Sequence, residues 1–203
     1  MITLENVGKT FGAKAVIKDL SYVFDGGRCY VISGKSGCGK STLLRLIAGL
    51  DKKHEGRISG ACRVSMSFQD ARLFPWLNAL ENAAVGLNGS GADKEKKKSE
   101  ASSLLLRLGL SKSDFGSAAG ELSGGMQARV GIARALLRDA DTYLFDEPFA
   151  NLDQATALSC ADVIRELTSA RGKICLIVSH AVEPPGSVRL ECAGDPFGSF
   201  TDI

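Results

Sequence analysis

The segment VISGKSGCGKSTLLRLIAGL, residues 31–50, decides the fold. It begins with β-forming valine and isoleucine, passes through a glycine-rich turn, and continues as TLLRLIAGL, whose apolar residues recur at helical spacing. The order is therefore strand, loop, helix. Within the loop, Gly34, Gly39, Lys40 and Ser41 satisfy the pattern G-x-x-x-x-G-K-[ST], and the flanking strand and helix are the context that supports this motif.

This loop carries the chemistry of a triphosphate-binding site. Glycines let the backbone approach a polyphosphate closely and adopt positive φ, so consecutive N–H groups can face its oxygens, and the helix adds its positive end. Lys40 is expected to reach the β- and γ-phosphates, and the Ser41 hydroxyl to ligate Mg²⁺. A glycine-rich turn that carries Lys-Ser by chance is the alternative, and the matching context argues against it. The residues expected at the nucleotide are Gly34, Lys35, Ser36, Gly37, Cys38, Gly39, Lys40, Ser41 and Thr42.

Length and composition fit an ordinary globular protein. With 203 residues, 44% of them hydrophobic and 24% charged, and a net charge of +2, the chain can form one large domain or two compact subdomains. The apolar runs are too short to cross a membrane, and the start MITLENVGKT lacks the regions of a signal peptide, so we expect a cytoplasmic protein. The six scattered cysteines should be reduced and serve mostly as small core residues, with Cys38 at a variable loop position.

Apolar patterning predicts strands at both ends of the chain and a mainly helical middle at 79–133. The polar stretch 51–60 reads as a connection. The strands are expected at 2–7, 15–17, 20–24, 63–68, 142–147 and 173–179, the first three forming an antiparallel sheet beside the nucleotide site.

Two further motifs can serve a bound nucleotide. LSGGMQ, residues 122–127, precedes a helix that Ser123 can cap, and its glycines leave N–H groups free to face an anion. TYLFDEP, residues 142–148, is a buried-type strand that ends in Asp146 and Glu147. Because side chains alternate along a strand, the two carboxylates should project differently, which suits one for Mg²⁺ and the other for polarising water. By itself, such a pair is often mere surface charge.

The motifs occur in a characteristic chain order: the glycine-rich loop, Gln69 after the next strand, LSGGM, the strand ending in Asp146 and Glu147, and His180 after one more strand. In this order they resemble the ATP-binding subunit of an ABC (ATP-binding cassette) transporter, over essentially residues 2–183. LSGGM beside the other motifs is specific to that family among P-loop NTPases. The resemblance implies an α/β fold, with a P-loop NTPase (RecA-like) core, an antiparallel β subdomain and an inserted helical subdomain. It implies one domain, 1–203, with a catalytic core at 1–78 plus 134–203 and a helical subdomain at 79–133.

The resemblance also implies roles for single residues, with ATP and Mg²⁺ as the ligands. Phe11 would stack on the adenine, although by spacing alone it reads as a core or turn aromatic, and His180 would contact the γ-phosphate. Asp153 would lie in a loop that communicates between subunits. The implied catalytic residues are Glu147 as general base, His180, Gln69 and Lys40, and the implied metal residues are Ser41, Gln69 and Asp146.

The resemblance implies partners as well. Ser123, Gly124 and Gly125 would touch ATP held by a second copy, because LSGGM lies on the helical portion and cannot easily fold back onto its own loop. Two ATP molecules would thus be enclosed in a dimer. The remaining expected partners are integral-membrane permease subunits and a solute-binding protein, which would place the chain on the inner face of the cell membrane. No nucleic acid is expected, since the lysine-rich run at 94–98 is typical of a solvated helix start.

Within the family, the chain is similar to importer ATPases of the nitrate, sulfonate and taurine type. In such proteins the segment after the glutamine forms a groove for the membrane subunit, so Phe74, Trp76 and Leu77 are candidates for a docking surface. Internal packing of Trp76 is an equally open alternative.

Some residues depart from the family pattern. Ala128 stands where glutamine is common, and Pro184 and Pro185 exclude the longer helix that usually follows the histidine. A weak or partner-dependent ATPase is therefore an open possibility. The alternatives to a transport ATPase are a soluble ABC ATPase acting on nucleic acid or ribosomes and a low-turnover nucleotide-dependent regulatory subunit. A small-molecule kinase or GTPase fits poorly, because LSGGM has no role there. The transported solute is not encoded in these motifs.

Overall fold

The computed structural model describes residues 1–87, 92–169, 172–180 and 182–202. Its centre is a six-stranded sheet with the strand order β5-β6-β7-β3-β8-β9. Strands β5 to β8 run parallel, and β9 pairs antiparallel with β8. The strands are β3 (Cys29–Ser33), β5 (Val64–Ser67), β6 (Thr142–Asp146), β7 (Ile174–Val178), β8 (Val188–Ala193) and β9 (Ser199–Asp202).

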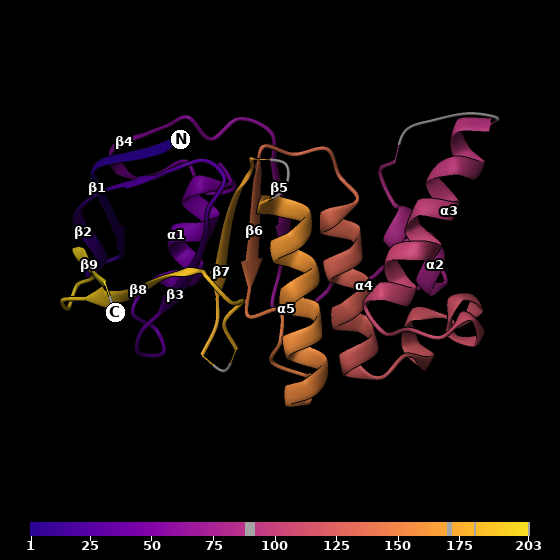
Figure 1. The fold of residues 1–203 in the computed structure, drawn as a ribbon. Helices are drawn as coiled ribbons and strands as arrows, with labels where there is room; N and C mark the ends of the chain where they lie inside the picture. Colours follow the sequence, from indigo (N-terminus) through magenta and orange to yellow (C-terminus); the bar gives the residue numbers. More distant parts are fainter. Residues whose placement is uncertain (88–91, 170–171, 181, 203) are drawn as a thin grey trace.

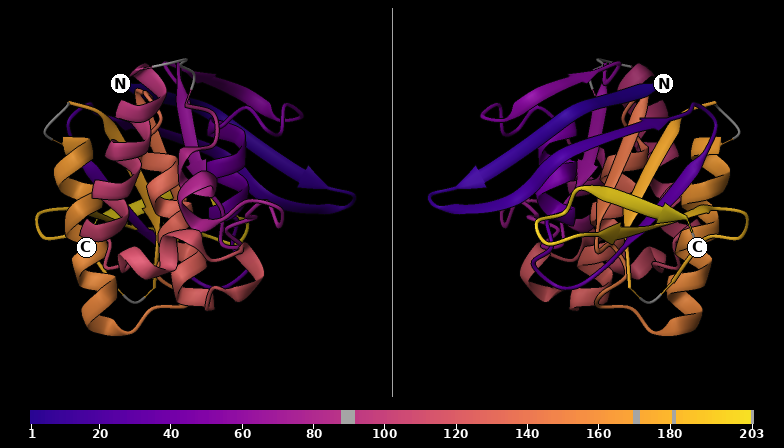
Figure 2. Two further views of the ribbon diagram at one scale, coloured as in Figure 1. Left: turned by 90° about the vertical axis from the view of Figure 1, so that its right-hand side faces the viewer. Right: turned by 90° about the vertical axis from the view of Figure 1, so that its left-hand side faces the viewer.

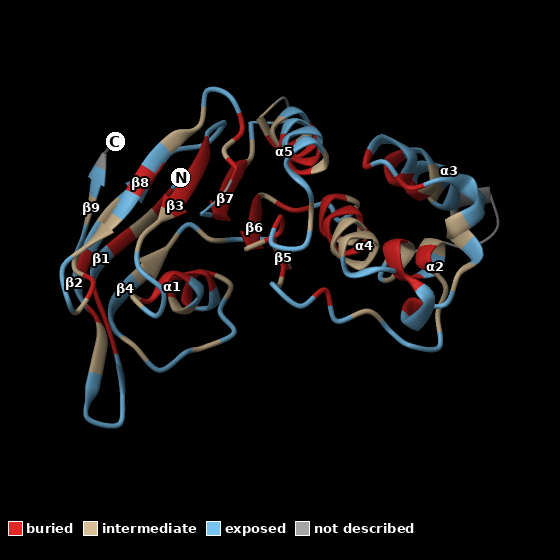
Figure 3. Ribbon diagram, turned by 90° about the horizontal axis from the view of Figure 1, so that it is seen from below, coloured by how far each residue is buried: buried red, intermediate tan, exposed pale blue. Residues whose placement is uncertain are grey.

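Helices cover both faces of this sheet (Figure 1). Alternation along β3 explains the layers, because Cys29 and Val31 join one hydrophobic core while Tyr30 and Ile32 join the other. The first core packs against α2, α3, α4 and α5, and the second packs against α1 and the amino-terminal strands. Figure 3 shows the buried residues facing the sheet and the exposed residues on the outer helix faces. The helices are α1 (Lys40–Ile47), α2 (Ala79–Ala84), α3 (Ala92–Arg107), α4 (Gly124–Leu136) and α5 (Gln154–Ser169), with short 3-10 turns η1 (Lys112–Gly116) and η2 (Ala119–Glu121).

A second sheet, of order β2-β1-β4, is antiparallel as expected. Its details differ from the sequence prediction. The two short strands predicted at 15–17 and 20–24 are one strand, β2 (Lys14–Phe24), because register shifts against β1 (Ile2–Phe11) absorb the interruption. The polar stretch at 51–60 contains β4 (Glu55–Ser59), whose residues are exposed or half-buried. Its pairing rests on backbone hydrogen bonds to β1, so no apolar pattern marks it in the sequence.

The carboxyl-terminal part forms strands that the sequence analysis did not predict. After Pro184, whose carbonyl accepts a hydrogen bond from the Ser187 N–H at 3.2 Å, the chain enters β8 and β9 rather than a helix. The Phe197 N–H donates to Val16 O at 3.1 Å, and the Lys18 N–H donates to Phe197 O at 2.9 Å. These bonds join the end of the chain to β2, so the hairpin connects the two sheets on the side of the molecule where both termini lie (Figure 2).

Helices α2, α3 and α4 pack together at the opposite end from the antiparallel sheet (Figure 1). Helix α4 continues through 133 and 134, the boundary expected between the helical and catalytic parts, and therefore joins them covalently. The predicted α/β architecture, with its antiparallel sheet and helical region, is confirmed. Within the described residues, none of the helices combines the length and the apolar character that crossing a membrane requires.

Candidate nucleotide site

The glycine-rich loop connects the end of β3 to the start of α1. Gly34, Gly37 and Gly39 have φ values of 138°, 76° and 119°, which are rare for residues with a side chain. Gly39 occupies the N-cap position of α1, and among the described residues no side chain caps this helix. The first N–H groups of α1 therefore lack a side-chain acceptor and can serve an anion.

Lys40 is buried beneath this loop, with only 6% of its surface exposed. Its Nζ donates to Gly34 O at 2.7 Å and to Lys35 O at 3.0 Å. The two carbonyls satisfy a buried ammonium that would otherwise be costly. The positive charge thus sits inside the concave side of the loop, next to the helix amino terminus.

Ser41 and Asp146 bring the loop and β6 together. The Ser41 Oγ donates to Asp146 Oδ1 at 2.8 Å. Burial raises the pKa of Asp146 above its ordinary value, while the Ser41 hydrogen bond and the charge of Lys40 act in the opposite direction. A partly desolvated carboxylate beside a hydroxyl oxygen is a donor set that Mg²⁺ prefers, so these residues fit a magnesium ion.

Glu147 faces the same region from a different backbone conformation. Its φ is 47°, in the left-handed region, and its N–H donates to Val178 O at 3.0 Å. His180 Nε2 lies 3.2 Å from Glu147 Oε1. Burial raises the pKa of Glu147, and the nearby His180 and Lys40 oppose this rise. The predicted divergence of Asp146 and Glu147 has a different cause from simple strand alternation: β6 ends at Asp146, and the left-handed residue that follows turns the chain.

One cavity of about 450 Å³ gathers most of the predicted site. The predicted residues that line it are Ser36, Gly37, Gly39, Lys40, Ser41, Thr42, Gln69, Glu147 and His180. Val16 and Ala150 line it too, although the sequence analysis did not single them out. Ala150 could have been found from its place three residues after Glu147, whereas Val16 carries no chemical signal. Its Cγ1 would lie 3.0 Å from a Cβ added at Gly39, so this approach requires glycine.

Three predicted loop residues and the predicted adenine contact lie elsewhere. Lys35 and Cys38 line a neighbouring cavity that shares Ser36 and Gly37 with the first, and Gly34 lies beside Cys38. Phe11 is at the end of β1, is 52% exposed and does not line the cavity that holds Lys40. Lys9 Nζ lies 4.8 Å from the centre of the Phe11 ring.

Ser123, Gly124 and Gly125 line a separate cavity at the start of α4. The Ser123 side chain caps α4 as predicted, accepting from the Met126 N–H at 3.2 Å. A Cβ added at Gly125 would lie 2.8 Å from Asn151 O, so glycine permits the loop at 151–153 to pack closely. The described residues that line this cavity and those around Lys40 are entirely different sets.

Comparison with known proteins agrees with this geometry. A model of the family described as "ABC transporter" matches residues 17–150. The chain belongs to the ABC transporter family. It is 40% identical over 190 residues to the Fe(3+) ions import ATP-binding protein of Agrobacterium fabrum, covering 88% of this chain and 54% of that protein. It is 36% identical to the aliphatic sulfonates import ATP-binding protein of Corynebacterium glutamicum, covering 89% and 74%, and 38% identical to the taurine import ATP-binding protein of Pseudomonas aeruginosa, covering 84% and 67%.

Solved structures of ABC cassettes have the same fold. A dimeric ATP-binding cassette in a post-hydrolysis state, bound to ADP and Pi, superposes with a TM-score of 0.87 at 26% identity, covering 100% of this chain and 98% of the other. The expected cassette fold is thereby confirmed, and so is the resemblance to importer subunits. Because relatives of similar identity are named for iron, sulfonates and taurine, the similarity does not select a solute. The chain spans about half the length of the iron-import relative that it matches, at 54%.

Proposed function

We propose that this protein is the ATP-binding and ATP-hydrolysing subunit of an ABC transporter that drives import of a small solute. The observation that carries the proposal is the cavity in which a buried lysine, a serine–carboxylate pair and a carboxylate–histidine pair meet on one glycine-rich loop. A binding protein without turnover needs the lysine and the loop but has no use for Glu147 beside His180. For the same reason, the proposal favours an ATPase over a purely regulatory subunit.

The geometry supports a distinct role for each residue. Lys40 holds the β- and γ-phosphates, and Ser41 and Asp146 would hold Mg²⁺, which would supply positive charge against the phosphates. Glu147 accepts a proton from the water that attacks the γ-phosphorus, and its raised pKa suits a general base. His180, 3.2 Å from Glu147, orients this carboxylate and donates to the γ-phosphate. Gln69, which lines the cavity, positions the water and completes the metal site.

In this proposal, a second copy of the chain contributes further contacts to the bound ATP. Ser123, Gly124 and Gly125 lie on a surface that belongs to a different cavity from Lys40, so in our proposal they contact ATP bound by the partner. In this arrangement the exposed ring of Phe11 stacks on the adenine. Residues 79–133 act as the helical subdomain, and residues 1–78 plus 134–203 act as the catalytic core. ATP then bridges the two copies, and hydrolysis removes the bridging group.

The permease docks, in this proposal, on the aromatic turn at 74–77. Trp76 is 74% exposed, which is incompatible with the alternative of internal packing, and its ring centroid lies 5.3 Å from that of Phe74. The turn is held from below by buried Asn82, which accepts from the Phe74 N–H at 2.7 Å and donates to Leu77 O at 3.0 Å. A fixed turn that presents apolar rings to solvent fits a cytoplasmic segment of a permease.

Beside this turn lies a cavity of about 440 Å³, with Met66, Phe68 and Phe74 in its wall and Arg134 and Arg138 at its edge. An apolar groove with basic residues suits a helix that carries both apolar and acidic side chains. The protein then works on the inner face of the cell membrane, together with a permease and a solute-binding protein.

The first test measures ATP hydrolysis and mass in the same preparation. We expect Mg²⁺-dependent release of phosphate, and the Glu147→Gln variant with saturating ATP should shift in light scattering from 21.4 kDa toward twice that mass. The shift should be absent without nucleotide. A strictly monomeric variant at saturating ATP and high protein concentration contradicts the shared site.

The second test addresses the permease. After co-expression with a candidate permease that co-purifies with the parent protein, Trp76→Ala should abolish co-purification while leaving the melting temperature within a few degrees of the parent. Leu158→Ala is the matched control, since Leu158 is an exposed apolar residue on α5, away from the aromatic turn. Equal loss of binding in both variants contradicts the docking surface. Stimulation of hydrolysis by RNA or DNA, and none by the permease, contradicts the transport role.

A further inference from the structure

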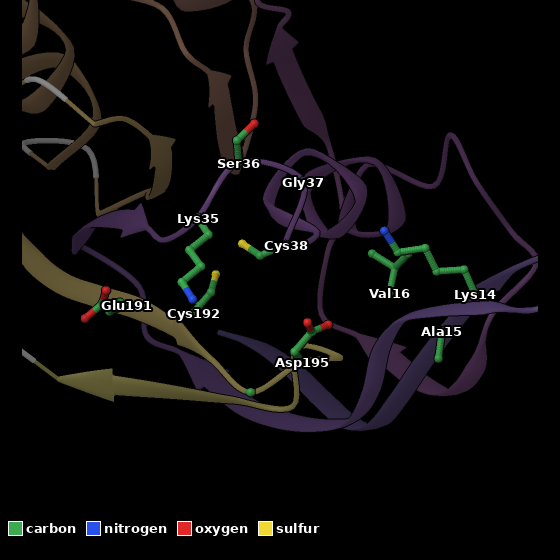
Figure 4. A pocket seen from close by; sticks show the side chains of 11 residues that line it. Lys14, Ala15, Val16, Lys35, Ser36, Gly37, Cys38, Glu191, Cys192 and Asp195 are labelled. Atoms are coloured by element: carbon green, nitrogen blue, oxygen red, sulfur yellow. The ribbon is translucent and has the colours of Figure 1, made fainter.

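Two cysteines meet behind the nucleotide-binding loop. Cys38 lies in the loop between Gly37 and Gly39, and Cys192 lies on β8, more than 150 positions later in the sequence. Both line a cavity of about 350 Å³ that opens beside the loop, together with Lys35, Glu191 and Asp195. In Figure 4 the two side chains point toward one another across this cavity.

The position of Gly34 between the two cysteines shows that they are close together. A Cβ built on Gly34 would lie 3.0 Å from Cys192 Cβ and 3.3 Å from Cys38 Sγ. The two side chains therefore flank one point in space, and only the missing side chain of Gly34 leaves room for both. Disulfides need Cβ atoms about 3.5–4.5 Å apart, so bond formation requires the glycine-rich loop to hold the Cys38 Cβ within this range of the Cys192 Cβ.

The surroundings of the two sulfurs differ. Lys40 Nζ lies 4.0 Å from Cys38 Sγ, and Cys38 precedes the positive end of α1. A positive environment of this kind favours attack by the sulfur. Burial raises the pKa of the Cys192 thiol, and the neighbouring Cys38 raises it further. Cys38 is thus the sulfur that reacts first, and Cys192 is the one that resolves the product.

A second pair of cysteines provides an internal comparison. Cys29 and Cys175 are direct neighbours on the parallel strands β3 and β7, and both are buried in the core. An oxidant dissolved in water therefore reaches them less readily than it reaches cysteines that border a cavity. Cys38 and Cys192 are half-buried and border a cavity.

We propose that Cys38 and Cys192 are an oxidation site, at which a peroxide converts the two thiols into a reversible disulfide that ties the nucleotide-binding loop to β8 and weakens ATP binding. The consequence for ATP rests on the proposed function, whereas the disulfide does not. Because Cys38 and Cys192 belong to different parts of the chain and meet in the fold, the disulfide forms between them in the folded protein.

The chemistry balances with hydrogen peroxide as the oxidant. The Cys38 thiolate attacks one peroxide oxygen, an S–O bond forms, the O–O bond breaks, and the leaving hydroxide takes a proton to become water. The Cys192 sulfur then attacks the Cys38 sulfenic sulfur, an S–S bond forms and the S–O bond breaks. The oxygen leaves as a second water with the proton from Cys192. Two thiols are oxidised by two electrons, and one peroxide is reduced.

Weakened ATP binding follows from the position of Cys38. Lys40 is hydrogen-bonded to Gly34 O and Lys35 O, and it must exchange these carbonyls for phosphate oxygens when ATP binds. That exchange requires the loop between Gly34 and Lys40 to adjust. A covalent bond from Cys38 to β8 restricts the adjustment, since β8 is itself held by β3 and β9.

Peptide mass spectrometry tests the bond directly. After exposure to hydrogen peroxide and blocking of remaining thiols, trypsin should release SGCGK, residues 36–40, joined to the peptide that begins at Leu190 and carries Cys192. Dithiothreitol should separate the two peptides. Absence of the joined peptides when a sulfenic-acid probe labels Cys38 overturns the proposal. So does equal joining of the Cys29 and Cys175 peptides, which would indicate oxidation of unfolded protein.

Titration with a fluorescent ATP analogue and Mg²⁺ tests the consequence. We expect oxidised protein to bind at least about tenfold more weakly and dithiothreitol to restore binding to within twofold. Cys192→Ser should bind as the reduced parent does and should be insensitive to peroxide. Cys62→Ser changes an exposed cysteine that does not line this cavity and should remain as sensitive as the parent. Unchanged affinity of the joined protein overturns the effect on ATP. If the reduced parent fails to bind ATP, the proposed function fails, and peptide analysis still decides whether the disulfide exists.

Discussion

Two helix amino termini in this molecule follow glycine-rich sequences, and they are built differently. At α1 no side chain caps the helix, and Lys40, Ser41 and Asp146 surround its first turn. At α4 the Ser123 side chain caps the helix. The nearby carboxylates also differ: burial raises the pKa of Asp146 at the first end, whereas hydrogen bonds from Thr156 lower the pKa of Asp153 near the second.

This difference suits the α1 end for the hydrolysis reaction and the α4 end for binding contacts alone. Around α1, the charged side chains are partly buried, and their present partners can be exchanged for phosphate, metal and water. Near α4, the polar groups already have partners within the chain, since Asp153 accepts from both the N–H and the hydroxyl of Thr156. The α4 surface can add contacts to a nucleotide, while its carboxylate, Asp153, is already engaged by Thr156. The two ends therefore suit the two sides of a shared site.

The largest expected effect is a loss of ATP hydrolysis caused by a substitution on the α1 side alone. Glu147→Gln should lower the hydrolysis rate by about 10²–10⁴-fold, because the amide cannot accept the proton of the attacking water. Affinity for ATP should stay within a few fold, as measured by titration with a fluorescent analogue. Glu166→Gln, an exposed residue that pairs with Arg107, is the control and should hydrolyse ATP like the parent. Near-normal turnover in Glu147→Gln would remove its assignment as base.

The next largest effect distinguishes ATP binding at the start of α1 from ATP contacts at the start of α4. Lys40→Ala should weaken ATP binding by roughly 10- to 100-fold, since a charge-assisted contact is worth about 1.5–3 kcal/mol. Ser123→Ala should change the affinity of the dilute monomer less than twofold, yet lower hydrolysis most steeply at low protein concentration, where the dimer is scarce. If Ser123→Ala weakens ATP binding to the monomer as much as Lys40→Ala does, the two ends do not divide the work as proposed.

Acid should affect the α1 side selectively. Because burial raises the pKa of Glu147, the base becomes protonated at a higher pH than an ordinary glutamate, and the hydrolysis rate should fall roughly tenfold per pH unit below that pKa. A pH profile of the rate, with circular dichroism to confirm that the protein stays folded, provides the measurement. An activity that stays constant down to the ordinary glutamate range would exclude Glu147 as the titrating group.

The smallest expected effect is a pair of opposite changes in stability. Asp146 has a raised pKa in the fold, so its ionised form costs stability above that pKa, and Asp146→Asn should raise the melting temperature at neutral pH by a few degrees. Asp153 has a lowered pKa, so its contribution is present at neutral pH and is lost as the pH falls through the folded value. Asp153→Ala should therefore lower the melting temperature. Calorimetry without nucleotide measures both, and changes of the same sign would contradict the contrast between the two regions.

Local motifs made much of the site predictable. The strand, loop and helix of residues 31–50, the cap at Ser123 and the carboxylates after β6 each depend on residues close together in sequence. The prediction failed where pairing is long-range and carries no apolar pattern. β4 pairs with β1 mainly through exposed backbone, and β8 joins the central sheet beside β3 from more than 150 positions away.

The sequence by itself determined that a glycine-rich loop with a lysine and a serine would open a helix, because glycine conformations and helix ends are local properties of the chain. Only the tertiary structure decided which distant side chains meet that loop. Parallel pairing of β3, β6 and β7 brings Asp146 to Ser41 and Glu147 to His180, and the strand on the other side of β3 brings Cys192 to Cys38. The physical reason is that strand order depends on the burial of two whole sheet faces, which no single segment of sequence specifies.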